Sequence, residues 1–337
     1  MARTSRLMVA RVGDYECGAR ASGVWGVFMP SLKPIDFADI FGTTLDLLSE
    51  TTRAAISANN WNYRVLEGAE RDAVTIDLLQ RIESRRLTLV QNEDKSRWER
   101  GWGENLDDFK KSGGKLEALL PKYIRPGLPV RLYGDFVQPE DPNFESNWYS
   151  IYRGWFVQRH LSGFKNIFEF GSGSGFNVAY VAQQFPGARV MGLDWAQPSV
   201  EIVEALRKEH GLNVAGRQFD FFHPDETLDM PASSAVFTVG ALEQTGTQWE
   251  SFLEFILKKK PECCFHIEPI YEWYDHENNL VDYTAWKAHE VRNFWRGFPG
   301  KIIELEKQGR ARILKAKRIN FGSLVIEGYS QLFWKPV

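Results

Sequence analysis

The sequence predicts an α/β protein in which a mainly parallel β-sheet follows a mainly helical N-terminal region. From about residue 166, short apolar runs alternate with amphipathic helical patterns, which is typical of a parallel sheet. At the end of the chain, two strand-like segments follow each other without a helix between them and indicate an antiparallel pair. The earlier part has helical periodicity and then a proline-rich linker. For 337 residues about two domains are expected, and we place them at 1–140 and 141–337.

Composition and charge exclude several classes of protein. Hydrophobic residues make up 43% and charged residues 25%, so a disordered or fibrous chain is not expected. The net charge of −3 gives no general reason to bind nucleic acid or an anionic membrane, and no run approaches the ~20 apolar residues of a membrane helix. Three cysteines, Cys17, Cys263 and Cys264, define neither a disulfide framework nor a zinc site. We expect a reduced, cytoplasmic protein without a secretory signal.

The aromatic content, 14% of the chain, indicates either a broad aromatic core or a stacking pocket. In the N-terminal region we expect a helical cap that shapes a substrate pocket. Its predicted elements are helices at Thr43–Ala58, Gly68–Arg86 and, more weakly, Asn105–Leu120, a proline-rich linker, a strand-like run at Val130–Val137, and a helix at Ser146–Leu161.

The second half is predicted to be the sheet with its covering helices. Five strands are expected at Asn166–Phe170, Ala188–Leu193, Val214–Phe219, Ala235–Val239 and Cys263–Glu268. The helices between and after them are predicted at Phe176–Phe185, Gln197–His210, Gln248–Lys259 and Asp282–Phe298. The last two strands, Arg310–Asn320 and Val325–Trp334, are expected to be joined by a turn at Gly322.

A glycine-rich loop lies between the first of these strands and the helix after it. Gly171, Gly173 and Gly175 allow a ligand to approach the backbone closely, with the helix N-terminus behind it. Glu169 precedes the loop by two residues, and Asp194 ends the second strand, where an acid can accept hydrogen bonds from ribose hydroxyls. Together these residues predict a nucleoside-containing cofactor.

On these motifs the sequence resembles the class I S-adenosylmethionine-dependent methyltransferases. The resemblance covers roughly residues 146–337 and is carried by residues 168–175, by 192–195, and by 240–244 after the fourth strand. It implies a Rossmann-like seven-stranded sheet with an antiparallel C-terminal strand and S-adenosylmethionine as the cofactor. The resemblance implies that Gly171, Gly173 and Gly175 line the methionine and ribose of the cofactor and that Asp194 holds the ribose. It implies that the adenine is surrounded by Trp195, Asp220 and Phe221. It further implies that Glu169 lies near the methionine amino group and that Arg153, with Tyr152, is a candidate to bind the cofactor carboxylate.

Two alternatives remain open at this point. A dinucleotide-binding dehydrogenase also has a glycine loop and a later acid, but its fingerprint is GxGxxG, and Phe176 occupies the position of its third glycine. A cofactor-binding module without catalysis would keep the same motif.

Methyl transfer needs an acceptor held in line with the activated methyl group and, for a protonated acceptor, a base. Such groups lie beyond the carboxyl ends of the strands. The candidate bases there are Glu243, Glu268 and His276. The candidate substrate-binding residues are Tyr271, Trp273 and Tyr274 of the loop after the fifth strand, and Trp102 of the N-terminal cap. We expect O-methylation of a polar small molecule, such as a sugar or a natural-product intermediate, with N-methylation of a small amine as the alternative and no metal site.

Overall fold

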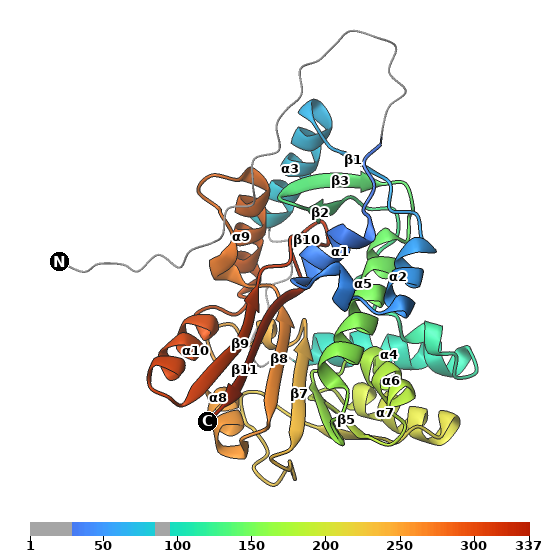
Figure 1. The fold of residues 1–337 in the computed structure, drawn as a ribbon, viewed down its shortest axis with the longest axis vertical. Helices are drawn as coiled ribbons and strands as arrows, with labels where there is room; N and C mark the ends of the chain where they lie inside the picture. Colours follow the sequence, from blue (N-terminus) through green and yellow to red (C-terminus); the bar gives the residue numbers. More distant parts are fainter. Residues whose placement is uncertain (1–28, 85–94) are drawn as a thin grey trace, which may run out of the picture.

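The computed structural model describes residues 29–84 and 95–337, and its centre is a seven-stranded sheet (Figure 1). The strand order is β6-β5-β4-β7-β8-β11-β9. The strands are β4 (Asn166–Phe170), β5 (Arg189–Asp194), β6 (Val214–Gln218), β7 (Ser234–Val239), β8 (Cys263–Glu268), β9 (Ala311–Lys317) and β11 (Ser330–Pro336). Only β11 runs against its neighbours β8 and β9, while β4 to β8 are parallel. The predicted Rossmann-like sheet with an antiparallel C-terminal strand is therefore confirmed.

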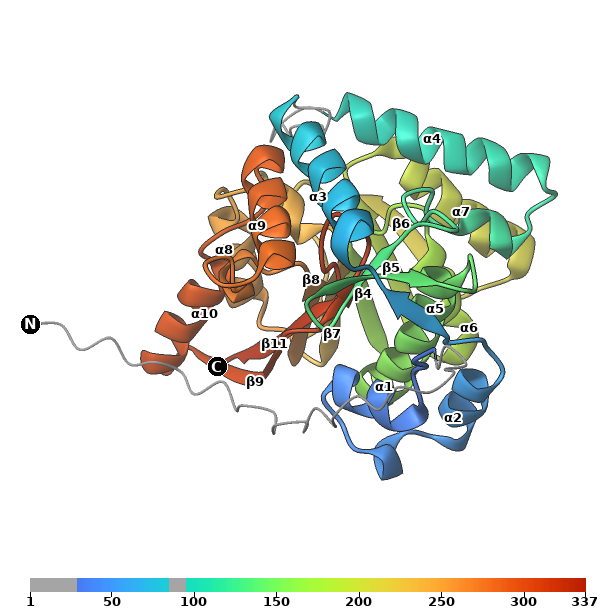
Figure 2. The same ribbon diagram turned by 90° about the horizontal axis from the view of Figure 1, so that it is seen from above.

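Helices cover both faces of this sheet because its strands present apolar side chains on both sides. The helices of the first face are α5 (Phe144–Phe156), α6 (Phe176–Gln184) and α7 (Gln197–His210), and those of the second are α8 (Glu250–Lys259) and α10 (Phe298–Lys307). Neighbouring residues of one strand divide between the two cores: Ile167 packs in the first and Phe168 in the second. Helix α9 (Leu280–Arg292) lies with α3 (Gly68–Glu83) near the carboxyl edge of the sheet (Figure 2).

The N-terminal part is less helical than expected, because it contains most of a second, four-stranded sheet of order β1-β3-β2-β10. Its strands are β1 (Tyr63–Val65), β2 (Val130–Leu132), β3 (Asp135–Pro139) and β10 (Phe321–Gly322). The remaining helices are α1 (Pro34–Phe41), α2 (Glu50–Ser57) and α4 (Ser96–Lys111), with short 3-10 turns at Leu45–Leu47 and Leu116–Leu119. Strand β10 comes from the C-terminal half, and one hydrophobic core includes residues from both sides of position 140.

Four local predictions were wrong, two of them because of left-handed backbone residues that the apolar pattern does not reveal. The single strand Val130–Val137 is a hairpin, since Tyr133 and Gly134 both adopt positive φ and form its two-residue turn. The long helix Asp282–Phe298 ends at Arg292, because Asn293 is left-handed and closes it. Gly322 is a strand residue paired with Arg131 and not a turn. The third predicted helix also starts earlier, at Ser96.

Much of the aromatic excess is core. Phe41 meets Trp148 and Trp155, and Trp148 stacks on Phe321 with ring centroids 4.1 Å apart. These rings come from α1, α5 and β10, so they join the N-terminal elements to the end of the chain.

A glycine in this aromatic junction provides a direct test of the close packing. A Cβ atom on Gly322 would lie 2.3 Å from the Ile326 carbonyl oxygen and 2.4 Å from the Glu327 Cα, and backbone atoms cannot move aside cheaply. We expect Gly322→Ala to lower the free energy of unfolding in urea by about 1–3 kcal/mol. The control is Gly328→Ala, because a Cβ there meets no atom within 4 Å. Equal stability of the two variants would contradict the packing.

Candidate active site

The loop between β4 and α6 holds its three glycines in the left-handed region. Their φ values are +76° at Gly171, +51° at Gly173 and +70° at Gly175, a conformation that other residues rarely adopt. There is also little room for a side chain at these positions. A Cβ on Gly171 would lie 2.2 Å from the Ala241 Cβ, and one on Gly173 would lie 2.8 Å from the Trp102 indole. The sequence motif therefore reflects both backbone conformation and close approach.

Asp194 holds this loop in shape from the end of β5. Its carboxylate accepts hydrogen bonds from the backbone N–H of Gly173 at 2.8 Å and of Ala196 at 2.9 Å. Burial raises the pKa of Asp194 to about 6, and these two hydrogen bonds act in the opposite direction. The acid is thus tied to the glycine loop itself, at the position expected for the ribose ligand.

The predicted adenine residues gather on the same edge of the sheet, after β5 and β6. Lys95 connects two of them, because its ammonium lies 3.4 Å from Asp220 Oδ2 and 5.5 Å from the centroid of the Trp195 ring. Phe221 lies further in, against Phe252 of α8, with ring centroids 4.8 Å apart.

Helix α4 of the N-terminal part lies across this region. Its Glu99 accepts a hydrogen bond from the Gln197 backbone N–H at 3.1 Å, at the start of α7. Trp102, one turn further on, stacks on Trp98 and covers the backbone of Gly173. The predicted substrate-binding residue Trp102 is thus a neighbour of the glycine loop.

Glu169, at the end of β4, is 1% exposed and only partly satisfied. Its Oε1 accepts a hydrogen bond from Asn177 Nδ2 at 2.8 Å, and Asn177 Oδ1 in turn accepts from the Tyr149 hydroxyl at 2.8 Å. Glu169 Oε2 is buried and has no partner among the described residues. Burial raises the pKa of Glu169 to about 8. A buried carboxyl oxygen without a donor is one to which a ligand can donate.

Among the described residues Arg153 forms no hydrogen bond or ion pair with Glu169, although its charge opposes the effect of burial on the pKa of that carboxyl. Its Nη1 donates to the Phe176 carbonyl at 3.0 Å, and its guanidinium lies 3.7 Å from the Phe176 ring centroid and 4.4 Å from that of Tyr180. These contacts hold the first turn of α6. They give no support to the expectation that Arg153 binds the cofactor carboxylate.

Two of the predicted bases lie together. Glu268, fully buried at the end of β8, accepts hydrogen bonds from the backbone N–H groups of Ala241, Leu242 and Glu243 at 3.2, 3.1 and 3.3 Å. Burial raises the pKa of Glu268 to about 7, against the effect of these bonds. The pKa of Glu243 is held well above its usual range, mainly by burial and secondly by the negative charge of the neighbouring Glu268. Glu268 therefore positions the loop after β7, and Glu243 is the more accessible carboxyl, at 6% exposure.

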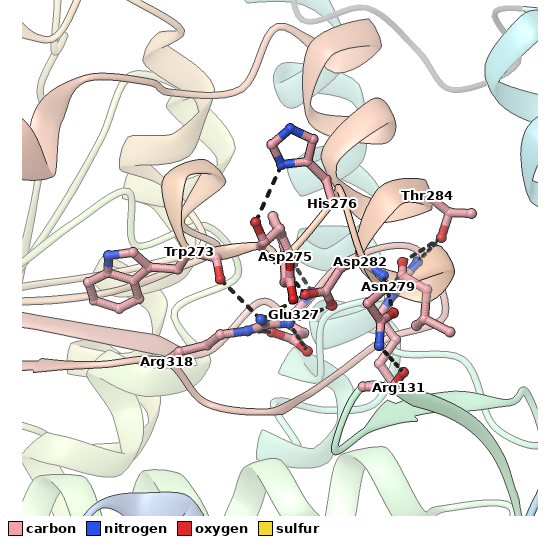
Figure 3. A network of polar contacts seen from close by, with 12 residues as sticks. Arg131, Trp273, Asp275, His276, Asn279, Asp282, Thr284, Arg318 and Glu327 are labelled. Atoms are coloured by element: carbon pink, nitrogen blue, oxygen red, sulfur yellow. Dashed lines mark hydrogen bonds and ion pairs between the residues drawn. The ribbon is translucent and has the colours of Figure 1, made fainter. Parts of the chain in front are cut away.

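The third predicted base, His276, has different neighbours. Its ring stacks on Trp286 of α9 with centroids 4.3 Å apart, and its Nδ1 lies 3.4 Å from the Tyr274 carbonyl oxygen. Figure 3 shows His276 directed away from the ion pairs beneath this loop. Among the described residues no hydrogen bond or ion pair joins His276 to Glu243 or Glu268, so the structure does not bring the three predicted bases together.

The aromatic loop after β8 is also more enclosed than expected. Tyr274 is buried and its hydroxyl accepts from the Glu327 N–H at 3.2 Å, while the Trp273 carbonyl accepts from Arg318 at 3.0 Å. Tyr271 packs against Trp286, with ring centroids 5.5 Å apart. The loop is thus fastened to α9 and to the segment before β11.

Three residues that the sequence analysis missed are connected to Glu169 through the hydrogen bond between Tyr149 and Asn177, and a fourth, Tyr123, interacts with Glu169 electrostatically. Glu145 and Tyr149 share one face of α5, four residues apart. Tyr329 precedes β11, whose reversed direction brings this end of the strand beside Glu268 through the Ser330–Glu268 pair. Tyr123 lies in the linker before β2. The helical spacing of Glu145 with Tyr149 was a usable signal, whereas the places of Tyr329 and Tyr123 depend on contacts between distant segments.

Searches for similar proteins return structures only. No protein-family model and no curated protein sequence matches the chain. One of these structures is PKMT2 from Rickettsia typhi in complex with AdoHcy, with 16% identity and a TM-score of 0.30 over 34% of this chain and 23% of that chain. Another is the [4+2]-cyclase SpnF, with 13% identity and a TM-score of 0.45 over 70% of this chain and 94% of that chain. A third is a SAM-dependent methyltransferase from Aquifex aeolicus, with 15% identity and a TM-score of 0.34 over 54% of this chain and 89% of that chain. The chain thus spans less than a quarter of PKMT2. The strand order of the sheet, rather than these distant likenesses, defines the Rossmann-like fold.

Among the described residues no helix is both long and apolar enough to cross a membrane. Within the same residues no group of three or more His, Cys, Asp or Glu side chains is arranged to hold a metal ion. Cys17 lies outside the described residues.

Proposed function

We propose that the protein is an S-adenosylmethionine-dependent methyltransferase that acts on a polar small molecule of the cytoplasm. One observation carries the proposal. The glycine loop, Asp194 beneath it and the unpartnered Glu169 oxygen lie together at the carboxyl edge of a seven-stranded sheet whose last strand is antiparallel. Ligands of doubly wound sheets bind at this edge.

The chemistry of these residues fits the cofactor. Asp194 and Asp220 offer carboxylate oxygens to ribose hydroxyls and to the adenine amine, Trp195 offers a ring face, and Glu169 Oε2 offers an acceptor to the methionine ammonium. When bound, the cofactor supplies a methyl group already activated on a sulfonium. The work left to the protein is to orient the acceptor, exclude water and remove a proton.

Asp194 provides the test of cofactor binding. We expect Asp194→Ala to weaken binding of S-adenosylhomocysteine by about 10- to 150-fold, since hydrogen bonds to a charged group contribute about 1.5–3 kcal/mol and the glycine loop also loses its anchor. Calorimetric titration measures this. The control is Asp225→Ala, because Asp225 pairs with Arg217 on the outer side of β6. Unchanged affinity in Asp194→Ala would exclude this site for the ribose.

For the proton we assign Glu243 as the base, with Glu268 as its positioning residue. A raised pKa makes the Glu243 carboxylate a stronger base toward a hydroxyl acceptor, and Glu268 fixes its backbone through three N–H groups. This arrangement supports O-methylation as the leading reaction, with N-methylation of an amine as the alternative. His276 remains a weaker candidate, since its contacts are to Trp286 and the Tyr274 carbonyl.

Glu243→Gln tests this assignment once an acceptor is found. General-base catalysis contributes about 10²- to 10⁴-fold, so we expect kcat to fall by about that factor with cofactor affinity unchanged. His276→Ala is the comparison and is expected to keep kcat within about threefold. The reverse result would make His276 the base.

A protein that binds S-adenosylmethionine but transfers no methyl group to any acceptor would be a binding module, and one that binds NAD⁺ instead would be a dehydrogenase-like protein.

A further inference from the structure

Two uncharged side chains form a hydrogen-bonded chain that ends on Glu169, and the proposed function gives neither of them a role. Asn177, in the first turn of α6, donates from Nδ2 to Glu169 Oε1 at 2.8 Å, and its Oδ1 accepts from the hydroxyl of Tyr149 at 2.8 Å. Arg153, one turn after Tyr149 on α5, donates to the Phe176 carbonyl at 3.0 Å and so holds the turn that carries Asn177. The chain therefore reaches the end of β4 from two different helices.

The Tyr149 hydroxyl is fixed as a donor. Its ring is 3% exposed and stacks against the rings of Tyr329 and Phe176, with centroids 5.3 and 6.3 Å apart. Burial raises the pKa of Tyr149, so the hydroxyl keeps its proton at neutral pH. In the described part of the chain its one hydrogen bond is to Asn177. A buried hydroxyl that keeps its proton and has one partner donates to it, so Tyr149 determines which end of the Asn177 amide it faces.

The orientation of this amide decides what Glu169 can bind. Because Asn177 Oδ1 accepts from Tyr149, the NH₂ group faces Glu169 and makes Oε1 an acceptor. Glu169 Oε2, which is buried and has no partner among the described residues, is then left to accept from a ligand. With the amide reversed, its carbonyl would face the carboxyl group and favour the protonated acid, which donates and does not attract an ammonium group.

The hydrogen bond from Asn177 is also the main contact that favours an ionised Glu169. Burial raises the pKa of Glu169 to about 8, and the Asn177 hydrogen bond is the largest influence in the opposite direction. The charge of Asp194 raises this pKa, that of Arg153 lowers it, and the backbone N–H of Val178 lowers it by less. Loss of the amide therefore leaves the carboxyl group protonated more often and its free oxygen a poorer acceptor.

We propose that Asn177 and Tyr149 are positioning residues that keep Glu169 Oε2 as the acceptor for the ammonium group of the cofactor. The inference rests on the proposed function and deepens it, because it assigns a specificity: the chain selects adenosine ligands with a cationic amino acid end over those without one. Asn177 follows Gly175 by two residues, so the turn that completes the glycine loop also carries the selecting amide.

Two ligands that differ in this end test the proposal. S-adenosylhomocysteine has the amino acid group, whereas 5′-methylthioadenosine keeps the adenine, the ribose and the sulfur but lacks it. Both are titrated by calorimetry into the full chain near neutral pH. We expect Asn177→Leu to weaken binding of S-adenosylhomocysteine about tenfold or more and to leave binding of 5′-methylthioadenosine within about twofold, because only the first ligand uses Glu169. Tyr149→Phe is expected to act in the same direction, by about three- to tenfold, since it removes a neutral hydrogen bond.

Two further variants distinguish positioning from a general effect on the fold. Asn59→Leu is the matched control, because this amide donates to the Ala55 carbonyl on α2, and both affinities are expected to stay within about twofold. In a Glu169→Gln background, Asn177→Leu is expected to change binding of S-adenosylhomocysteine by less than about twofold, since the two residues act through one contact.

The outcomes separate the inference from the proposed function. Equal losses for the two ligands in Asn177→Leu, or a full loss that persists in the Glu169→Gln background, would show a structural role and overturn the inference alone. If Asn177→Leu does not fold, as judged by circular dichroism, Tyr149→Phe decides in the same way, because it keeps the stacked ring. Failure of the unchanged protein to bind either ligand would overturn the proposed function and the inference with it.

Discussion

Arg318→Met is expected to lower the free energy of unfolding by about 3–5 kcal/mol, the usual cost of leaving buried carboxylates without their partner. Arg318 donates to Asp282 at 2.6 and 2.8 Å and to Glu327 at 2.7 and 3.0 Å, and both acids are 2% exposed (Figure 3). It also donates to the Trp273 carbonyl at 3.0 Å. The network therefore joins α9, the loop after β8 and the segment before β11.

The matched control is Arg64→Met. Arg64 also forms an ion pair, with Glu70, but the two side chains are 46% and 59% exposed. Exposed pairs contribute about 0–1 kcal/mol, so little change is expected in the urea denaturation midpoint. Equal losses in the two variants would show that the buried network does not fix the loop after β8.

Binding of S-adenosylhomocysteine is expected to release up to about one proton per molecule near pH 7, and Glu169 is the source. In the free protein the pKa of Glu169 is raised to about 8 by burial, so this carboxyl is mainly protonated at pH 7. An ammonium bound at Glu169 Oε2 favours the ionised form, and the proton leaves. Affinity is therefore expected to rise by up to about tenfold per pH unit from pH 6 to 7.5, and to level off above about pH 8, where Glu169 is already ionised in the free protein.

Calorimetry in two buffers of different ionisation enthalpy measures the released protons. Glu169→Gln is expected to remove the release, whereas Glu254→Gln, at an exposed position of α8, is expected to keep it. The same carboxyl has a consequence for the free protein. Because its folded pKa lies above the unfolded value, it stabilises the fold at low pH and this contribution is lost as the pH rises through about 8. A release that persists in Glu169→Gln would show that another group receives the ammonium.

The sheet and the cofactor loop were predictable because their signals are local. Strand β8 begins and ends at the predicted residues, Cys263 and Glu268, since a buried parallel strand is a short apolar run. The glycine loop was predictable because positive φ at three alternate positions favours glycine at each of them. In the helix after β8, the apolar pattern continues through Phe294 and Trp295 beyond the left-handed Asn293, so the sequence overstates its length.

The acceptor side was less predictable because it is built by contacts between distant segments. His276 follows β8 directly, as expected of a base, but it stacks on Trp286 while Tyr274 turns into the interior. Glu268 has the right position, yet its carboxylate is used to hold the loop that carries Glu243. Tyr329 reaches the site only because β11 is antiparallel, and no local pattern specifies that it meets Glu145.

The most direct test of the central claim is a calorimetric titration of the full chain with S-adenosylhomocysteine and, separately, with NAD⁺. The account predicts a single site per chain for S-adenosylhomocysteine, with a dissociation constant in the micromolar range or below, and no heat of binding for NAD⁺. Binding of NAD⁺ at that site without binding of S-adenosylhomocysteine would contradict it.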